Sequence, residues 1–160
     1  MSRPISQSMN RRFDRLPVWA VALALLLGAP QLSRAQDADS IAIRHVLQQF
    51  AELWAGADAT GLASITARLR ISVRPESELV GPLQPRQVVA VLRQLFDEKE
   101  SISLQPGEIR LMDGSPAQAF AEVVWSHRTR GTTSTEKGCL FLKLDLGEEG
   151  WRITEIRLLP

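Results

Sequence analysis

The stretch Gly138–Leu159, GCLFLKLDLGEEGWRITEIRLL, decides the fold. Apolar and polar residues alternate on both sides of Gly147–Gly150, which is the pattern of half-buried β-strands. The connection is short, so we predict an antiparallel hairpin with strands over 138–146 and 151–159. A third alternating run, 118–130, comes just before and predicts one more antiparallel strand.

Upstream of these strands the apolar residues recur with helical spacing. Residues 41–57 carry one apolar stripe, and Asp37 or Asp39 is expected to cap the start of this helix. His45 lies about 200° around the helix from the stripe, so it is expected to face water. Asp58 is expected to cap a short second helix.

A short strand and a third helix follow. Leu69, Ile71 and Val73 alternate with polar residues, and Pro85 fits the first turn of a helix. Beyond this helix the period returns to two, with a kink or bulge expected at Pro106–Gly107. Helices that precede a run of antiparallel strands indicate an α+β fold, with N-terminal helices packed on a curved antiparallel sheet.

The first 35 residues predict an export signal. The uncharged run Val18–Ala29 follows several arginines; it is shorter than the roughly 20 apolar residues of a spanning helix and fits a secretory signal peptide. Ser33 and Ala35 are small residues at the −3 and −1 positions, so we expect cleavage near Ala35. The mature domain, 36–160, is then secreted or periplasmic, without a stable membrane anchor. The alternative is a buried N-terminal helix.

The composition excludes several classes of protein. The chain has 160 residues, of which 44% are apolar and 23% charged, as in one soluble globular domain. The single cysteine, Cys139, and two histidines argue against a disulfide framework and a metal site, and no cofactor is expected. Cleavage removes five arginines and one aspartate, which leaves 14 basic and 17 acidic residues. Nucleic acid is therefore not an expected partner.

Charge and size matching suggest a register for the last strands. With Thr132-Thr133 as a two-residue loop, Glu122 lies opposite Lys143 and Val124 lies opposite Phe141. A shift of one residue in a strand would reverse the faces for that strand.

In this register the leucine-rich face lies under the helices and encloses a pocket. Its polar groups, His127, Glu155 and Arg157, are candidates for acid–base chemistry or ligand binding. Simpler alternatives are that His127 is solvated, that Glu155 pairs with Arg157, and that the tryptophans belong to the core. The expected pocket residues are Phe50, Trp54, Trp125, His127, Leu142, Glu155 and Arg157.

The opposite sheet face is expected to form a homodimer. A single domain should not leave a contiguous apolar group of this size in water, and a two-fold contact would cover it symmetrically. The expected contact residues are Phe120, Val124, Phe141, Ile156 and Leu158.

Three segments carry a likeness to a known family. They are the run from Ile43 through Trp54 to Gly56-Ala57-Asp58, the pair Gly81-Pro82 before the third helix, and Gly150-Trp151-Arg152-Ile153 in the last hairpin. With them, residues 39–159 resemble the nuclear-transport-factor-2-like (NTF2-like) superfamily, including its SnoaL-like and ketosteroid-isomerase-like groups. The resemblance implies a cone-shaped pocket between helices and a curved sheet, in a family of isomerases, dehydratases, hydrolases and non-enzymatic binders.

Three functions remain open at this point. The leading one is an exported, non-catalytic domain that binds a small apolar molecule in a conical pocket. The second is a SnoaL-like isomerase or hydrolase that uses Glu155 or His127 as acid–base; it is weakened by the lack of tyrosine, which ketosteroid-isomerase-type sites use in the oxyanion hole. The third is a protein-interaction or dimerisation module with a filled core.

Overall fold

The structure is a computed structural model, and it divides the chain into two units, Met1–Gln36 and Asp37–Pro160. The apolar run of the expected export signal lies almost wholly outside the described residues, so the signal stays a prediction. No helix among the described residues is long and apolar enough to cross a membrane. The structure describes residues 29–73, 77–112, 114 and 116–159, with side chains from residue 37 onward.

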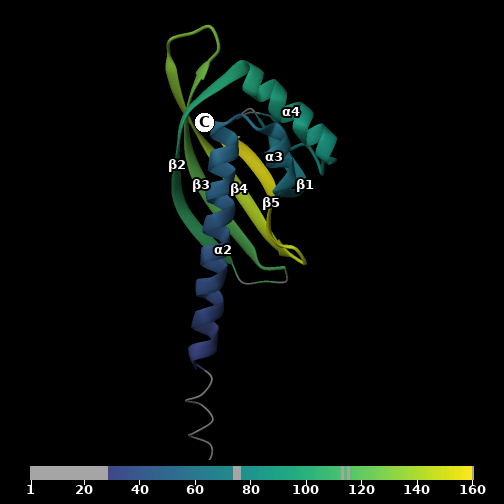
Figure 1. Cartoon of the computed structure of the whole chain (residues 1–160), viewed down its shortest axis with the longest axis vertical. Helices are drawn as coiled ribbons and strands as arrows, with labels where there is room; N and C mark the ends of the chain where they lie inside the picture. The colour runs from purple at the N-terminus through teal and green to yellow at the C-terminus, as the bar shows by residue number, and fades with distance from the viewer. Residues whose placement is uncertain (1–28, 74–76, 113, 115, 160) are drawn as a thin grey trace, which may run out of the picture. The chain divides into compact units, whose positions relative to one another are not determined.

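Helices and strands follow one another in the expected order (Figure 1). They are α2 (Ala29–Ala55), α3 (Ala59–Ser64), β1 (Thr66–Ser72), α4 (Pro85–Glu98), β2 (Lys99–Met112), β3 (Gln118–Thr129), β4 (Thr135–Gly147) and β5 (Gly150–Leu159).

The five strands form one open sheet in the order β1-β5-β4-β3-β2. The α+β fold class is confirmed, but the sheet is mixed, because β1 runs parallel to β5 while all other pairs are antiparallel. Short connections make consecutive strands antiparallel, but β1 pairs with β5, the last strand of the chain, and not with β2, the strand that follows it in sequence.

The helix boundaries have local causes. Asp58 caps α3 as predicted: its Oδ1 accepts hydrogen bonds from the backbone N–H of Thr60 at 3.1 Å and of Gly61 at 2.8 Å. Pro85 opens α4, also as predicted. The expected cap of the first helix at Asp37 or Asp39 is wrong, because α2 already begins at Ala29.

Asp39 has another role within α2. Its Oδ1 accepts a hydrogen bond from the indole Nε1 of Trp151, at 3.1 Å, and so links α2 to β5. His45 is exposed, as the helical pattern predicted.

The pairing of β3 with β4 differs from the predicted register by two residues. Glu122 lies opposite Phe141, and Val124 lies opposite Cys139, because the hairpin is centred one residue earlier, between Gly131 and Thr132, than the predicted Thr132-Thr133 loop. Side chains alternate with a period of two, so this shift leaves every β3 and β4 residue on its predicted face.

The pairing of β5 with β4 contains a bulge that does change faces. Arg152 lies opposite Asp145, as the charges indicated, but Glu155 lies opposite Lys143. Between these pairs β5 has one extra residue, Thr154, and a one-residue insertion reverses the faces of the rest of the strand.

Ile156 and Leu158 therefore point into the core, where they are 1% and 8% exposed. Placing them on the dimer face was wrong. Placing Glu155 and Arg157 under the helices was also wrong, since both lie on the opposite face, with Lys143.

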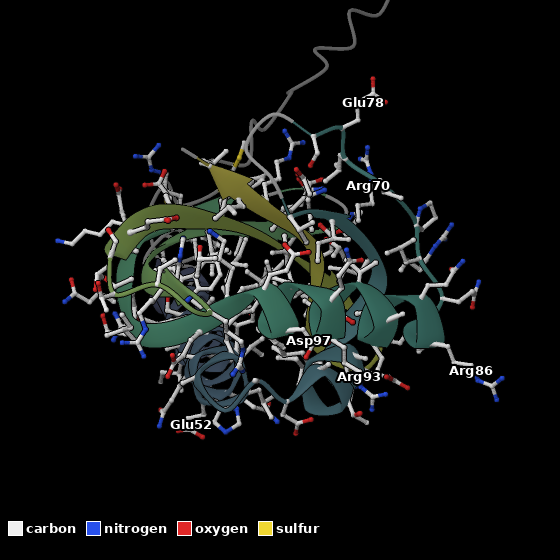
Figure 2. The ribbon with its side chains drawn as sticks, turned by 90° about the horizontal axis from the view of Figure 1, so that it is seen from above. Glu52, Arg70, Glu78, Arg86, Arg93 and Asp97 are labelled. Atoms are coloured by element: carbon white, nitrogen blue, oxygen red, sulfur yellow. The ribbon has the colours of Figure 1, made fainter. Side chains whose placement is uncertain are left out.

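An aromatic group fills the space between the helices and the sheet. The ring of Trp54 on α2 lies 5.1 Å from Phe50, 5.3 Å from Phe96 on α4 and 5.4 Å from Trp125 on β3, measured between centroids. All four residues are buried. Seen from above in Figure 2, α4 crosses the curled sheet, and Arg86 projects away from it.

The bulged pairing of β5 leads to a prediction about the free energy of unfolding. Ile156→Ala should lower the free energy of unfolding by about 2–5 kcal/mol, because it empties part of the core. Ile102→Ala makes the same change at a side chain that is 51% exposed on β2 and should cost at most about 1 kcal/mol. Urea unfolding of both variants measures the difference; an Ile156→Ala cost no larger than that of Ile102→Ala would contradict the bulged pairing.

Candidate functional site

The expected conical pocket is closed by its own side chains. Phe50, Trp54, Trp125 and Leu142 are each at most 1% exposed and belong to the central core. The alternative that the tryptophans are core residues is confirmed. The pocket interpretation of these four residues is wrong, because the aromatic rings occupy the space in which a ligand was expected.

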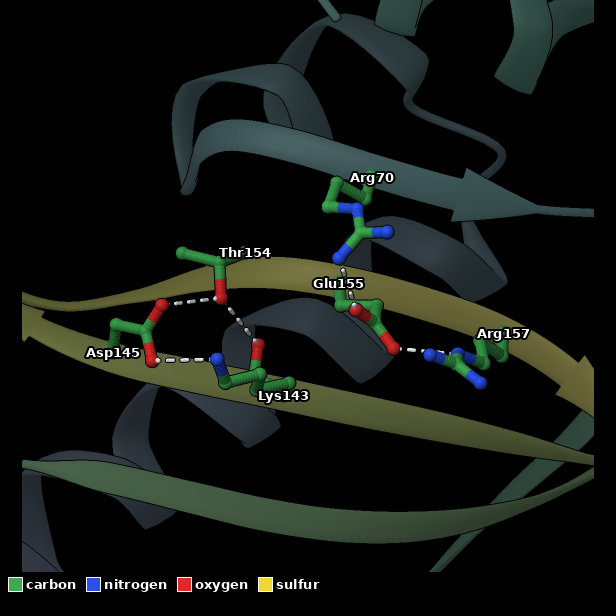
Figure 3. Close-up of polar contacts among 6 residues, drawn as sticks. All are labelled: Arg70, Lys143, Asp145, Thr154, Glu155 and Arg157. Atoms are coloured by element: carbon green, nitrogen blue, oxygen red, sulfur yellow. Dashed lines mark hydrogen bonds and ion pairs between the residues drawn. The ribbon is translucent and has the colours of Figure 1, made fainter. Parts of the chain in front are cut away.

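Glu155 and Arg157 pair with each other on the far side of the sheet. Arg157 donates from Nε to Glu155 Oε1 at 2.5 Å, and Arg70 Nη1 lies 3.7 Å from Glu155 Oε2 (Figure 3). The alternative of mutual pairing is thus confirmed. Only 8% of the Glu155 side chain is exposed, so a buried carboxylate is held between two guanidinium groups.

His127 is neither solvated nor part of an open pocket. It is 4% exposed, and its ring lies 4.2 Å from the ring of Trp125. Nδ1 makes no hydrogen bond and lies 3.8 Å from Glu136 Oε2, which itself accepts a hydrogen bond from Lys99 Nζ at 3.0 Å. Burial, and then the charge of Lys99, lowers the pKa of His127, so the imidazole is neutral at pH 7.

A cavity of about 540 Å³ lies next to Lys99, between α4, β1 and the end of β5. Most of its wall is apolar, and the bulge supplies Leu158 to it. At one end lies Lys99, whose ammonium group is already bonded to Thr129 and Glu136. Glu78 also belongs to the lining, and its side chain points outward in Figure 2. The apolar lining consists of Ile71, Val73, Val80, Val91, Leu95 and Leu158.

Sequence reasoning missed this cavity. It assigned Leu158 to the other face and placed β1 in no particular position, so nothing brought Ile71 and Leu158 together. One signal was available: along β5 the apolar residues change phase, from Trp151 and Ile153 to Ile156 and Leu158, across the polar pair Thr154-Glu155. Such a phase change indicates a bulge.

A second hollow, a groove of about 560 Å³, lies on the opposite face of the sheet. Its polar contacts are ordered (Figure 3): Thr154 Oγ1 donates to Asp145 Oδ2 at 2.9 Å, and Lys143 Nζ lies 3.4 Å from Asp145 Oδ1. The lining residues are Ala67, Arg68, Arg70, Gly81, Pro82, Lys143, Asp145, Thr154 and Glu155.

The same sheet face also carries the apolar residues expected at a dimer contact. Phe120 and Phe141 stack with ring centroids 5.6 Å apart, and Val124 beside them is partly exposed. Burial raises the pKa of the Cys139 thiol, which stays protonated at neutral pH. Within the described ranges, no group of three or more His, Cys, Asp or Glu side chains is placed to hold a metal ion.

Comparison with known proteins identifies the architecture. The sequence matches no protein-family description and no curated protein. A domain of unknown function with a cystatin-like fold from Nostoc punctiforme has a TM-score of 0.59 at 21% identity, over 76% of each chain. A candidate dehydratase of the NTF2-like family from Streptomyces avermitilis has a TM-score of 0.60 at 12% identity, over 78% of this chain and 97% of that one. This chain has the NTF2-like fold.

A third structure extends the range of activities named within the NTF2-like fold. A candidate scytalone dehydratase from Novosphingobium aromaticivorans has a TM-score of 0.62 at 14% identity and covers 79% of this chain and 86% of its own. At these identities the likeness concerns the fold alone, because one fold hosts many functions.

Burial of His127 gives a prediction for the pH dependence of stability. Because its pKa is lowered in the folded protein, the unfolded chain, with a pKa of about 6.5, binds more protons below neutrality. The free energy of unfolding should therefore fall as the pH decreases from about 7.5 to about 5.5.

Matched variants isolate this effect. His127→Gln should flatten the pH dependence over that window, whereas His45→Gln, at the exposed histidine, should leave it unchanged. Thermal unfolding at a series of pH values measures both. If His127→Gln and wild type keep parallel profiles, His127 does not stay neutral in the folded state.

Proposed function

We propose that this protein binds a small, mostly apolar molecule in the cavity between α4, β1 and β5, without catalysing a reaction. The observation that carries the proposal is the cavity itself, with a volume of about 540 Å³ and a wall to which Ile71, Leu95 and Leu158 contribute. Ligand pockets typically measure about 300–1,000 Å³ and combine an apolar wall with a few polar groups.

The polar end of the cavity supports a neutral ligand. Lys99 Nζ already donates to Thr129 Oγ1 at 3.2 Å and to Glu136 Oε2, so its charge is compensated within the protein. The carboxylate of Glu98, also in the lining, accepts from the described residues one long hydrogen bond, from Gln94 at 3.4 Å. An anionic group would meet this carboxylate, whereas a hydroxyl or amide could donate to it.

An enzymatic role has less support in the geometry. Glu155 is a paired carboxylate on the other face, and His127, whose ring lies tilted against that of Trp125, is not among the residues that line the cavity. Catalysis by general acid or base needs a group within hydrogen-bond reach of the substrate. The similar structures that are named as candidate dehydratases share only their fold with this chain, and a shared fold does not establish a shared activity.

We also propose export after cleavage near Ala35 and a homodimer through the opposite sheet face. The dimer contact is now limited to Phe120, Val124 and Phe141, since Ile156 and Leu158 belong to the core. The stacked phenylalanine pair supports it, because aromatic residues are enriched at the centres of interfaces.

Filling the cavity tests ligand binding. The neutral fluorescent probe N-phenyl-1-naphthylamine should bind the wild type saturably, and Val91→Trp, which places an indole in the cavity, should abolish that binding. Val89→Trp is the matched control, because Val89 is also half-buried on α4 but lines a different hollow. No saturable signal in the wild type, or equal loss in both variants, would refute the site. Mass spectrometry of molecules that co-purify with the native protein would then identify the natural ligand.

A charged substitution tests the dimer. Phe141→Glu should shift the protein toward monomer, because an unpaired charge buried in an apolar contact costs several kcal/mol. Ile41→Glu, at an exposed position on α2, should not. Light scattering at micromolar concentration measures both; a wild type that is already monomeric ends this proposal.

A further inference from the structure

The groove on the opposite face of the sheet has the form of a second binding site. It lies where β1 and β5 both leave regular pairing: β1 places the three residues between Thr66 and Arg70 opposite the single bulged residue Thr154. Bulges of this kind redirect side chains and recur beside functional sites.

The wall of the groove on the β1 side is tightly packed. Gly81 has φ +138°, and a Cβ there would lie 2.6 Å from the carbonyl oxygen of Leu69 and 2.9 Å from Cα of Arg70. Backbone bonds hold the segment in place, with Leu83 N donating to Leu69 O at 2.8 Å and Val80 paired with Ile71. The groove is therefore a fixed feature of the fold.

Both acidic groups in the groove are occupied by partners of their own (Figure 3). Asp145 has Thr154 on one carboxylate oxygen and Lys143 near the other. Glu155 has Arg157 on one oxygen and Arg70 near the other. Three cationic side chains line the groove, against two acidic ones, and Arg157 adds a fourth positive charge at its end.

Arg68 is the one cationic side chain of the groove lining that pairs with neither Asp145 nor Glu155 among the described residues. It lines the groove and is exposed, and its side chain makes no hydrogen bond or ion pair with any other described residue. Its backbone has φ +48°, in the left-handed region that an arginine adopts only at a cost in free energy. A strained residue of this kind, held by its surroundings, points to a functional role.

We propose that this groove binds a small molecule that carries an oxyanion group, a carboxylate or a phosphate, between Arg68 and Arg70. Guanidinium groups present parallel N–H donors that match such groups in a bidentate manner. Glu155 has the role of a positioning residue, because its Oε2 lies 3.7 Å from Arg70 Nη1 and attracts this half-exposed guanidinium group from one side. This site is separate from the apolar cavity.

The test uses two probes, succinate and inorganic phosphate, each titrated into the intact protein at constant ionic strength. Arginine Nε–H signals in NMR spectra and titration calorimetry report binding. Arg68→Gln should weaken binding about tenfold or more, as expected for loss of a charge-assisted hydrogen bond. Arg44→Gln, at an exposed arginine on α2, should bind like the wild type.

A third variant keeps the test clear of folding defects. Arg68→Gly should lose binding while its melting temperature stays equal or rises, because glycine adopts a positive φ without strain. Saturable binding of either probe that depends on Arg68 supports the site, and the tighter probe identifies the acid group. The proposal fails if neither probe saturates the wild type, or if Arg44→Gln weakens binding as much as Arg68→Gln does.

Discussion

The bulge at Thr154 determines which side chains of the last strand are buried. Without it, the alternation that starts at Trp151 and Ile153 would bring Glu155 and Arg157 under the helices. With it, Ile156 and Leu158 take those positions. Burying one such aliphatic side chain contributes about 1.5–3 kcal/mol, whereas a fully buried ion pair recovers little beyond its desolvation cost. With the bulge, the Glu155 carboxylate is buried but its partner Arg157 stays 47% exposed. The bulged pairing is therefore favoured, and the Thr154 hydroxyl stabilises it by donating to Asp145.

Both candidate sites depend on this bulge. On the helix side, Leu158 becomes part of the wall of the apolar cavity beneath α4. On the other side, Glu155 is turned toward β1, where it meets Arg70 and forms the floor of the charged groove. Because of this one inserted residue, the end of β5 contributes an apolar side chain, Leu158, to the cavity on one face of the sheet and a charged one, Glu155, to the groove on the other.

The sequence predicted the elements better than their contacts, for reasons that individual residues make clear. Helical and strand periods are local, so α3 with its Asp58 cap and α4 with Pro85 could be located. The error of two residues between β3 and β4 changed no face. The bulge, however, can be predicted only if Thr154-Glu155 is recognised as a break in the alternation of apolar and polar residues. The pairing of Arg152 with Asp145 gives no help, because it precedes the bulge and is the same with or without it. The parallel pairing of β1 with β5 joins residues that are far apart in the chain, and no local pattern encodes it.

The aromatic group around Trp54 decides where a ligand can lie. In a cone of helices and sheet, catalysis at the apex needs both polar groups and room for a substrate. Here Phe50, Trp54, Phe96 and Trp125 occupy that room, and their packing excludes water as well as ligand. His127 is left behind this barrier with its Nδ1 unbonded, which the protein tolerates because the imidazole is neutral. The proposed binding of an apolar molecule is therefore assigned to the cavity beneath α4, where it would depend on apolar area and shape. The proposed recognition of an acid group belongs to the far side of the sheet, where the side chain of Arg68 has no partner among the described residues.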